Sequence, residues 1–250
     1  MLVKSIQKVT ALLKLVSFDV WNTLLSIDVF YKGISEELST ITGKGQFVLE
    51  NRLHEGYRKL KAIRRTGGFE ETKIVPVTLK AISKILKVDS EIVRVATKRT
   101  VMNISPKEYV IDGAKEAVEF AKNQSLEVAI VGNVLFWPGS YNRILLEKAG
   151  FSKLVEVQFY ADETGFSKPK PEIFDKVLSE FCVKAEEVLH VGDSVFEDFA
   201  GSILSHMHAV LIDSNVNGLI RLTGGKGHII PSIKWLENII KELVLGETAL

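Results

Sequence analysis

One stretch constrains what this chain can fold into more than any other: residues 14–25, which read KLVSFDVWNTLL. Leu15, Val16 and Phe18 form an apolar run typical of a short buried strand, and Asp19 follows it directly. Three later stretches also join an apolar run or a tight turn to polar residues: GNV at 132–134, SKPKPEIF at 167–174 and VGDSVFED at 191–198. Polar groups placed in this way converge at the carboxyl ends of the strands of an open α/β sheet. The four stretches therefore predict one site at one edge of a parallel sheet.

The pattern along the chain predicts both the sheet and a second, helical unit. After Tyr109, apolar runs alternate with amphipathic segments, which favours an α/β fold with a doubly wound, parallel, Rossmann-like sheet. Between the first strand and Tyr109 the periodicity is helical throughout. We therefore expect a Rossmann-like core formed by residues 1–25 and 107–250, and an inserted all-helical domain formed by residues 26–106. Strands are expected near residues 14–20, 126–132, 154–160, 187–192 and 209–213, helices near 113–123, 140–148, 171–181 and 196–205, and a short helix or extra strand within 1–12.

Charge and cysteine content restrict the possible partners and the compartment. The chain has 32 Lys and Arg against 31 Asp and Glu, so no long-range field favours a nucleic acid or an anionic membrane, and any anion must be held by a local site. Lysines interrupt every apolar run near the N-terminus, so we expect neither a signal peptide nor a membrane span. The single cysteine, Cys182, excludes an internal disulfide and lies in an apolar pattern that predicts a buried, inert thiol. These features fit a cytoplasmic protein.

In their order along the chain, the four polar stretches resemble the four motifs of the haloacid dehalogenase superfamily of aspartate-nucleophile hydrolases. The resemblance covers roughly residues 14–213 and implies that the inserted helices are a cap, which closes over the site and selects the substrate. It also implies that Asp19 is a covalent nucleophile. A carboxylate that attacks phosphorus forms an acyl phosphate, which divides one difficult displacement into two easier ones. A lone aspartate at a strand end would otherwise be a turn or cap residue.

The segment around Asp19 departs from the family pattern Asp-x-Asp-Gly-Thr at two positions. Thr23 matches, whereas Trp21 replaces the second aspartate, the family's general acid and base. Such a group typically contributes on the order of 10²- to 10⁴-fold in rate, so alkyl phosphates, with their very basic leaving alkoxides, become poor substrates. The resemblance implies that the backbone carbonyl of Trp21 still binds the metal. Asn22 replaces a glycine and tolerates the left-handed conformation better than most residues.

The second motif lacks a group that the family uses. Gly132 and Asn133 stand where the family has Ser or Thr, commonly followed by Asn, so the hydroxyl that would bind phosphate is missing. A backbone amide and the Asn133 side chain still provide donors for substrate, and glycine allows an anion to approach the backbone. An ordinary turn at the end of a strand explains the pair equally well.

The third and fourth motifs supply the charges that the resemblance requires. Lys168, in a Lys-Pro step before a helix, places a positive charge beside the aspartyl and phosphoryl oxygens. Asp193 is suited to coordinate Mg²⁺, which prefers oxygen ligands. Asp198 lies behind the metal and orients Lys168 or a metal-bound water, or else offsets a helix dipole. We interpret Lys170 as a solvated turn lysine and His190 as a hydrogen-bonded residue of the core.

These residues lead to one principal hypothesis: a Mg²⁺-dependent phosphohydrolase that acts on a small phosphorylated metabolite. In it, Asp19 and Lys168 are catalytic, Thr23, Gly132 and Asn133 bind substrate, and Asp19, Asp193 and the Trp21 carbonyl hold the metal. One alternative is a 2-haloacid dehalogenase, a branch that also lacks the second aspartate and has a tyrosine where Trp21 stands. A phosphonate hydrolase, which needs a cap lysine, and a weakly active phosphometabolite-binding protein are further alternatives. The cap arginines are either substrate contacts or, by default, solvated charges: Arg52, Arg58, Arg64 and Arg65.

Overall fold

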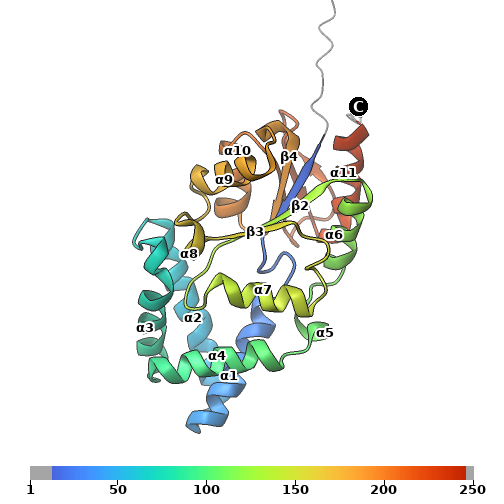
Figure 1. Ribbon diagram of the computed structural model, residues 1–250. Coiled ribbons are helices and arrows are strands. Elements are labelled where there is room, and N and C mark those ends of the chain that lie inside the picture. Colours follow the sequence, from blue (N-terminus) through green and yellow to red (C-terminus); the bar gives the residue numbers. More distant parts are fainter. Residues whose placement is uncertain (1–12, 246–250) are drawn as a thin grey trace, which may run out of the picture.

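The computed structural model describes residues 13–245 and contains a seven-stranded sheet (Figure 1). The strand order is β3-β2-β1-β4-β5-β7-β6, and the only antiparallel pairing among the described strands joins β6 to β7. The expected extra element within residues 1–12 lies outside the described residues. The strands are β1 Leu15–Phe18, β2 Glu127–Gly132, β3 Val157–Tyr160, β4 Val188–Gly192, β5 His208–Ile212, β6 Ile220–Arg221 and β7 Gly227–Ile230. The predicted α/β fold with a doubly wound parallel sheet is confirmed.

Helices account for most of the rest of the chain, and they fall into two groups. Those between β1 and β2 are α1 Ile27–Thr42, α2 Gln46–Arg65, η1 Glu71–Lys73, α3 Ile74–Leu86, α4 Ser90–Asn103, α5 Pro106–Tyr109 and α6 Ala114–Asn123. Those after β2 are α7 Gly139–Lys148, α8 Ala161–Thr164, α9 Pro171–Phe181, η2 Ala185–Glu187, η3 Val195–Ala200, α10 Gly201–Leu204, η4 Ile233–Trp235 and α11 Leu236–Leu245. None of the helices described is both long enough and apolar enough to span a membrane.

The register of the three central strands aligns the ends at which the polar stretches begin. Phe18 of β1 lies opposite Ile130 of β2 and Val191 of β4, and all three side chains are fully buried. Because the three strands are parallel, the residues that follow them emerge at the same edge of the sheet. This edge therefore carries Asp19 after β1 and Asp193 after β4.

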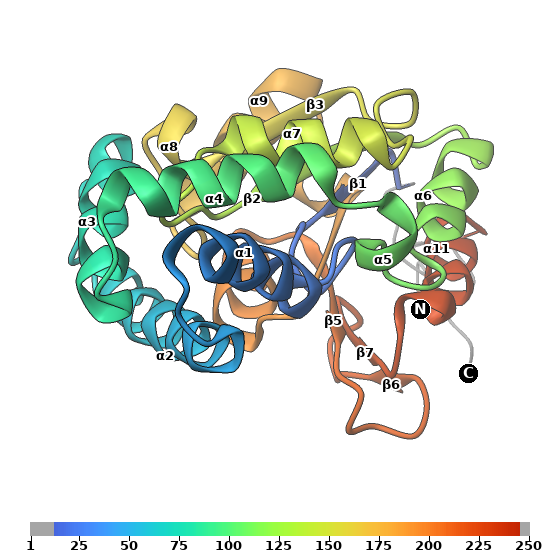
Figure 2. The same ribbon diagram turned by 90° about the horizontal axis from the view of Figure 1, so that it is seen from below.

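Helices α1 to α4 pack mainly on one another and lie at the edge of the sheet where β1 ends (Figures 1 and 2). The sequence starts α1 with Ser26, whose side chain accepts a hydrogen bond from the backbone of Val29, and ends it at Gly43, which has a φ of +69°. The apolar side of α1 is buried, including Phe30 and Tyr31. The expected all-helical insert is present, while its division from the core as a separate domain stays a prediction.

One local expectation was wrong. Cys182 is exposed, because α9 ends at Phe181 and Cys182 adopts a left-handed conformation with a φ of +51°. The helical periodicity that predicted its burial no longer applies beyond that point. The helix expected near residues 196–205 is present, as a π-helix over Val195–Ala200 that continues into one short turn of α-helix over Gly201–Leu204.

Candidate active site

Asp19 is the first residue after β1, and its backbone amide donates to the carbonyl of Val191 at 2.9 Å, which continues the pairing of β1 with β4. The residue is only 8% exposed. Its Oδ1 atom lies 2.7 Å from the Nζ atom of Lys168, 149 residues later in the chain. The fold thus brings together the first and third predicted motifs.

The Lys168 ammonium group is held between two carboxylates. It lies 2.7 Å from Asp19 and 2.6 Å from Asp198, and its side chain is 1% exposed. Although burial works against the charged form, the two carboxylates raise the pKa of Lys168. Lys168 is therefore a permanently charged group directly beside the candidate nucleophile.

Asn133 fixes the backbone on which Lys168 stands. Its side-chain oxygen accepts from the Lys168 amide and its side-chain nitrogen donates to the Lys168 carbonyl, both at 2.9 Å. The preceding Gly132 leaves room for Tyr160, because a Cβ atom at position 132 would lie 2.7 Å from that ring. Both residues thus contribute to the local structure of the site. The substrate-binding roles expected for Gly132 and Asn133 stay predictions.

Asp198 is fully paired, in contrast to Asp193. Asp198 accepts from the Ser194 amide at 2.9 Å and contacts His190 at 3.3 Å, in addition to its ion pair with Lys168. Gly192 permits this arrangement, since a Cβ atom there would lie 2.3 Å from the Asp198 carboxyl carbon. Asp193 has one weak contact in the described structure, a 3.4 Å approach from the Asn22 side chain.

The electrostatics of the three aspartates differ accordingly. Burial raises the pKa of Asp19 to about 7 despite Lys168, with Asp198 and Asp193 adding to the rise. Burial and the Asp198 charge raise the pKa of Asp193 to about 6. Burial also acts on Asp198, but Lys168 and His190 outweigh it and lower its pKa. The buried His190, as predicted, is a hydrogen-bonded core residue, which contacts Ser17 at 2.8 Å.

These three carboxylates are the group suited to a metal ion among the described residues. One oxygen from each of Asp19, Asp193 and Asp198 lies within 4.8 Å of the other two. Lys168 forms ion pairs with both Asp19 and Asp198 but supplies one positive charge for the two of them, and Asp193 makes no ion pair within the described part of the chain. A divalent cation that prefers oxygen ligands fits this incomplete charge compensation.

The turn after Asp19 contains two buried polar atoms without a hydrogen-bond partner in the described structure, the Thr23 hydroxyl and the Trp21 indole nitrogen. Asn22 between them has a φ of +60°, the left-handed conformation expected from its type. Its side chain contacts Asp193 and also accepts from the Ile27 amide at 3.3 Å. Asn22 thus connects the turn to the candidate metal ligand, which the sequence pattern did not indicate.

The helical insert contributes cations that meet at one carboxylate, Glu197. Arg64 donates to both Glu197 oxygens at 3.0 Å, Arg65 donates to one at 2.9 Å, and the Lys61 ammonium lies 3.7 Å away. Arg64 also donates to the carbonyl of Val134 at 3.0 Å, so it contacts the loop after β2 as well. Sequence analysis did not identify Glu197 or Lys61, because each is one charge among many until the fold brings the two segments together.

The four candidate cap arginines therefore separate into two pairs. Arg64 and Arg65 lie at the site, and the default interpretation of Arg64 as a solvated charge was wrong, since it is 6% exposed. Arg52 instead approaches the Leu86 carbonyl at 3.4 Å within the insert, and Arg58 is exposed.

A second contact between insert and sheet corrects the interpretation of Lys170. It is not a free turn lysine, because its ammonium group lies 2.6 Å from Glu71, which is 7% exposed. Glu71 also accepts from the Ser167 hydroxyl at 3.1 Å. The sequence could not indicate the pair, since 99 residues separate its members.

Comparison with known proteins agrees with this geometry. The family model of haloacid dehalogenase-like hydrolases matches residues 13–202, and the chain belongs to this family of hydrolases. The haloacid dehalogenase-like hydrolase domain-containing protein 3 of Mus musculus is 29% identical over 132 residues, which are 51% of this chain and 50% of that protein. The chain thus spans about half the length of the curated relatives it matches.

Solved structures of the family share the fold at low sequence identity. The HAD-hydrolase YfnB from Bacillus subtilis, bound to magnesium, superposes with a TM-score of 0.72 at 19% identity, covering 92% of this chain and 99% of that one. A 2-haloacid dehalogenase from Pseudomonas syringae superposes with a TM-score of 0.63 at 15% identity, covering 92% and 99%. These likenesses concern the fold and do not choose between phosphatase and dehalogenase chemistry.

Proposed function

We propose that this hydrolase is a Mg²⁺-dependent phosphohydrolase that acts on a small phosphorylated metabolite through an aspartyl-phosphate on Asp19. The observation that carries the proposal is the position of Asp193, a carboxylate without an ion-pair partner in the described structure, next to Asp19. Asp19 forms an ion pair with Lys168, whereas Asp193 lies beside it, half-buried, with no ion-pair partner among the described residues. A carboxylate without an ion-pair partner is suited to bind a metal ion. A dehalogenase, which attacks carbon, needs no metal ion.

In this proposal Asp19 is the nucleophile and Lys168 stabilises charge. The Lys168 ammonium opposes the effect of burial on the pKa of Asp19 and lies beside the oxygens that gain charge as phosphorus is attacked. Asp198 and Asn133 hold Lys168 by its side chain and its backbone. Mg²⁺, held by Asp19, Asp193 and the Trp21 carbonyl, would supply neutralisation of the phosphoryl oxygens.

The charge balance of the whole site supports a dianionic substrate. Four carboxylates face four cations, and the described residues thus balance one another: Asp19, Asp193, Asp198 and Glu197 against Lys168, Lys61, Arg64 and Arg65. A divalent metal ion would give the site a surplus of two positive charges. A phosphate dianion would restore neutrality, and the unpaired Thr23 hydroxyl would be available to it.

We further propose that helices α1 to α4 act as a cap. Arg64 joins the insert to the loops after β2 and β4, through Val134 and Glu197. Closure of this kind excludes water and completes the site. The magnesium-bound structure of YfnB reveals interdomain movement in that protein, which supports a movable cap here.

Trp21 determines what kind of phosphate ester can be hydrolysed. An indole cannot donate a proton to a leaving oxygen or remove one from water, so the first step favours leaving groups that need no proton. The second step, hydrolysis of the acyl phosphate, becomes slow for the same reason.

The second candidate, a 2-haloacid dehalogenase, is favoured by one observation. Trp21 lies among buried aromatic rings, with Phe30 at 5.0 Å and Trp137 at 5.5 Å between ring centroids, an environment that also suits an apolar haloacid. Asp193 favours the phosphohydrolase, because the dehalogenase reaction needs no metal ion and therefore no metal-binding carboxylate at this position.

Activity on 4-nitrophenyl phosphate and on 2-chloropropionate, each with Mg²⁺ and with a chelator, distinguishes the candidates. The proposal requires phosphate release that depends on Mg²⁺ and is lost in Asp19→Asn. Chloride release that the chelator does not affect, without phosphate release, would establish the dehalogenase. Absence of turnover with tight phosphate binding would indicate a binding protein.

A further inference from the structure

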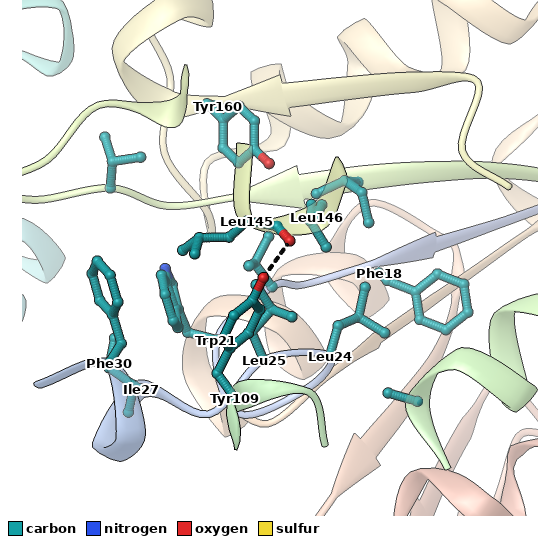
Figure 3. Close-up of a cluster of buried hydrophobic side chains, with 14 of the residues drawn as sticks. Phe18, Trp21, Leu24, Leu25, Ile27, Phe30, Tyr109, Leu145, Leu146 and Tyr160 are labelled. Atoms are coloured by element: carbon teal, nitrogen blue, oxygen red, sulfur yellow. Dashed lines mark hydrogen bonds between the residues drawn. The ribbon is translucent and has the colours of Figure 1, made fainter. Parts of the chain in front are cut away.

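Five aromatic side chains form a buried cluster directly beside the turn that carries Asp19. We call it the aromatic box, and it consists of Trp21, Phe30, Tyr31, Phe136 and Trp137. Trp137 is its centre, with ring centroids 4.6 to 6.0 Å from those of the other four. Figure 3 shows the Trp21 indole lying beside the Phe30 ring.

The aromatic box is divided between two parts of the chain. Trp21 follows β1, and Phe136 and Trp137 follow β2, so these three rings belong to loops at the edge of the sheet. Phe30 and Tyr31 belong to α1 of the helical insert. Movement of α1 away from these loops would therefore separate the rings and open a space next to Asp19.

Two polar atoms of the box lack partners. The Trp21 indole nitrogen and the Tyr31 hydroxyl are buried, and neither has a hydrogen-bond partner in the described structure. The two residues are 7% and 0% exposed. A buried donor left unpaired has a free-energy cost, because it loses its hydrogen bonds to water and gains none in the protein. Phenylalanine would fill either place without this cost, so packing alone does not account for the indole and the hydroxyl.

Arg64 adds a third donor on the same side of the site. Its Nε atom is also buried without a partner among the described residues, although its two terminal nitrogens are bound. Tyr57 lies against the box, with its ring centroid 5.6 Å from that of Tyr31. Among the described residues, the rings are thus accompanied by two unpaired groups that can only donate, the Trp21 indole nitrogen and Arg64 Nε, and by the Tyr31 hydroxyl, which can donate as well.

We infer that the aromatic box binds the leaving group of the substrate, and that this group is a planar aromatic ring bearing a hydrogen-bond acceptor. The inference rests on the proposed phosphohydrolase function and adds the substrate class. Aromatic rings bind a further ring by stacked and edge-on contacts. An aryl-type leaving group also needs no protonation, which is the property that Trp21 at the position of the general acid demands. Trp21 would thus have two effects. It stands in the place of the general acid, and it would contact the leaving groups that need no general acid.

The test compares two phosphates whose leaving groups both depart without protonation by a general acid. Only one of the two leaving groups contains an aromatic ring. Acetyl phosphate has the better leaving group and no ring, whereas 4-nitrophenyl phosphate carries a ring with an acceptor. We expect the wild-type protein with Mg²⁺ to favour 4-nitrophenyl phosphate in kcat/KM, against the intrinsic reactivity of the two compounds. Equal or lower kcat/KM for 4-nitrophenyl phosphate overturns the inference alone. Turnover of neither compound overturns the proposed function and the inference with it.

Variants locate the preference in the box. Phe30→Leu should lower kcat/KM for 4-nitrophenyl phosphate about two- to tenfold and leave acetyl phosphate unchanged within twofold. Phe151→Leu, an equally buried ring outside the box, controls for loss of packing and should leave the ratio of the two substrates unchanged. Tyr31→Phe, which removes only the unpaired hydroxyl, should lower kcat/KM for 4-nitrophenyl phosphate relative to phenyl phosphate. Equal losses on all substrates would assign the box to the packing of insert against sheet and contradict the inference.

Discussion

Arg64 of helix α2 donates to both carboxylate oxygens of Glu197 at 3.0 Å, and the two side chains are 3% and 5% exposed. This pair joins the helical insert to the π-helix that follows the candidate metal ligand. Burial raises the pKa of a carboxyl group, yet Arg64, Lys61 and Arg65 together lower the pKa of Glu197. Glu197 is therefore an ionised group at the contact between insert and sheet.

Glu197→Gln should lower the free energy of unfolding by about 3 kcal/mol, because it leaves the buried Arg64 charge without its counterion. Glu163→Gln is the matched control, since Glu163 pairs with Arg143 at the surface, where such a pair contributes less than about 1 kcal/mol. Urea denaturation of both variants gives the comparison. Equal losses would mean that Arg64 and Glu197 do not hold the insert in place.

Asp193→Asn should abolish Mg²⁺-dependent turnover and weaken Mg²⁺ binding, while the fold is retained. The reason is that Asp193 is the carboxylate without an ion-pair partner in the described structure, and an amide oxygen carries no charge for a cation. Titration calorimetry with Mg²⁺ alone measures the binding, and Asp213→Asn, a nearby acidic residue outside the cluster, is the control. Unchanged Mg²⁺ affinity in Asp193→Asn would remove Asp193 from the metal site.

Trp21→Asp should extend turnover to alkyl phosphates and raise the steady rate, by no more than the roughly 10²- to 10⁴-fold assigned to general acid and base groups. The same change removes a ring that packs on Phe30 and Trp137, so the variant should also be less stable, by about 3–5 kcal/mol. Steady-state rates on an alkyl and an aryl phosphate, with a thermal unfolding curve, test both parts. A stable variant with no gain on the alkyl phosphate would show that the missing acid does not limit the rate.

The contribution of His228 to stability should fall as the pH is lowered from about 6.5 towards 4, whereas the raised pKa values of Asp19 and Asp193 act in the opposite direction. Burial, helped by His208 and Arg221 and opposed by Glu242, lowers the pKa of His228 from 6.5 to about 4. Between these two values the unfolded chain binds a proton that the folded chain does not, so protons favour unfolding in this window. Urea denaturation of wild type and His228→Gln at several pH values should show a smaller pH slope in the variant. Identical slopes would contradict the assignment to His228.

The sequence was sufficient for strands β1 to β5 of the sheet, but not for β6 and β7. A strand that is buried on both faces has a continuous apolar run, so β1, β2 and β4 could be recognised, and the motifs that follow such runs or precede a helix identified Asp19, Lys168 and Asp193 by their resemblance to the family. These features depend on residues that are close in the sequence. They can therefore be recognised without knowing how distant segments pack.

The contacts between the insert and the sheet could not be predicted, because they join residues 70 to 133 positions apart. Glu197 and Glu71 resemble any other surface glutamate until Arg64 and Lys170 are placed against them. The aromatic box could not be predicted for the same reason, since its rings come from three segments that are separate in the sequence. Cys182 shows the opposite error, in which helical periodicity was continued one residue past the end of α9.

The most direct test of the account is the detection of a phosphoryl group on Asp19 during turnover. The wild-type protein is mixed with 4-nitrophenyl phosphate and Mg²⁺, quenched rapidly in acid and examined by intact-protein and peptide mass spectrometry, with Asp19→Asn in parallel. Because no side chain at position 21 activates water, the acyl phosphate should accumulate, with a burst of 4-nitrophenol before a slow steady rate. The account predicts one added phosphoryl group on the peptide that contains Asp19, absent in the variant. Turnover without any phosphorylated protein, or with the phosphoryl group on another residue, would contradict it.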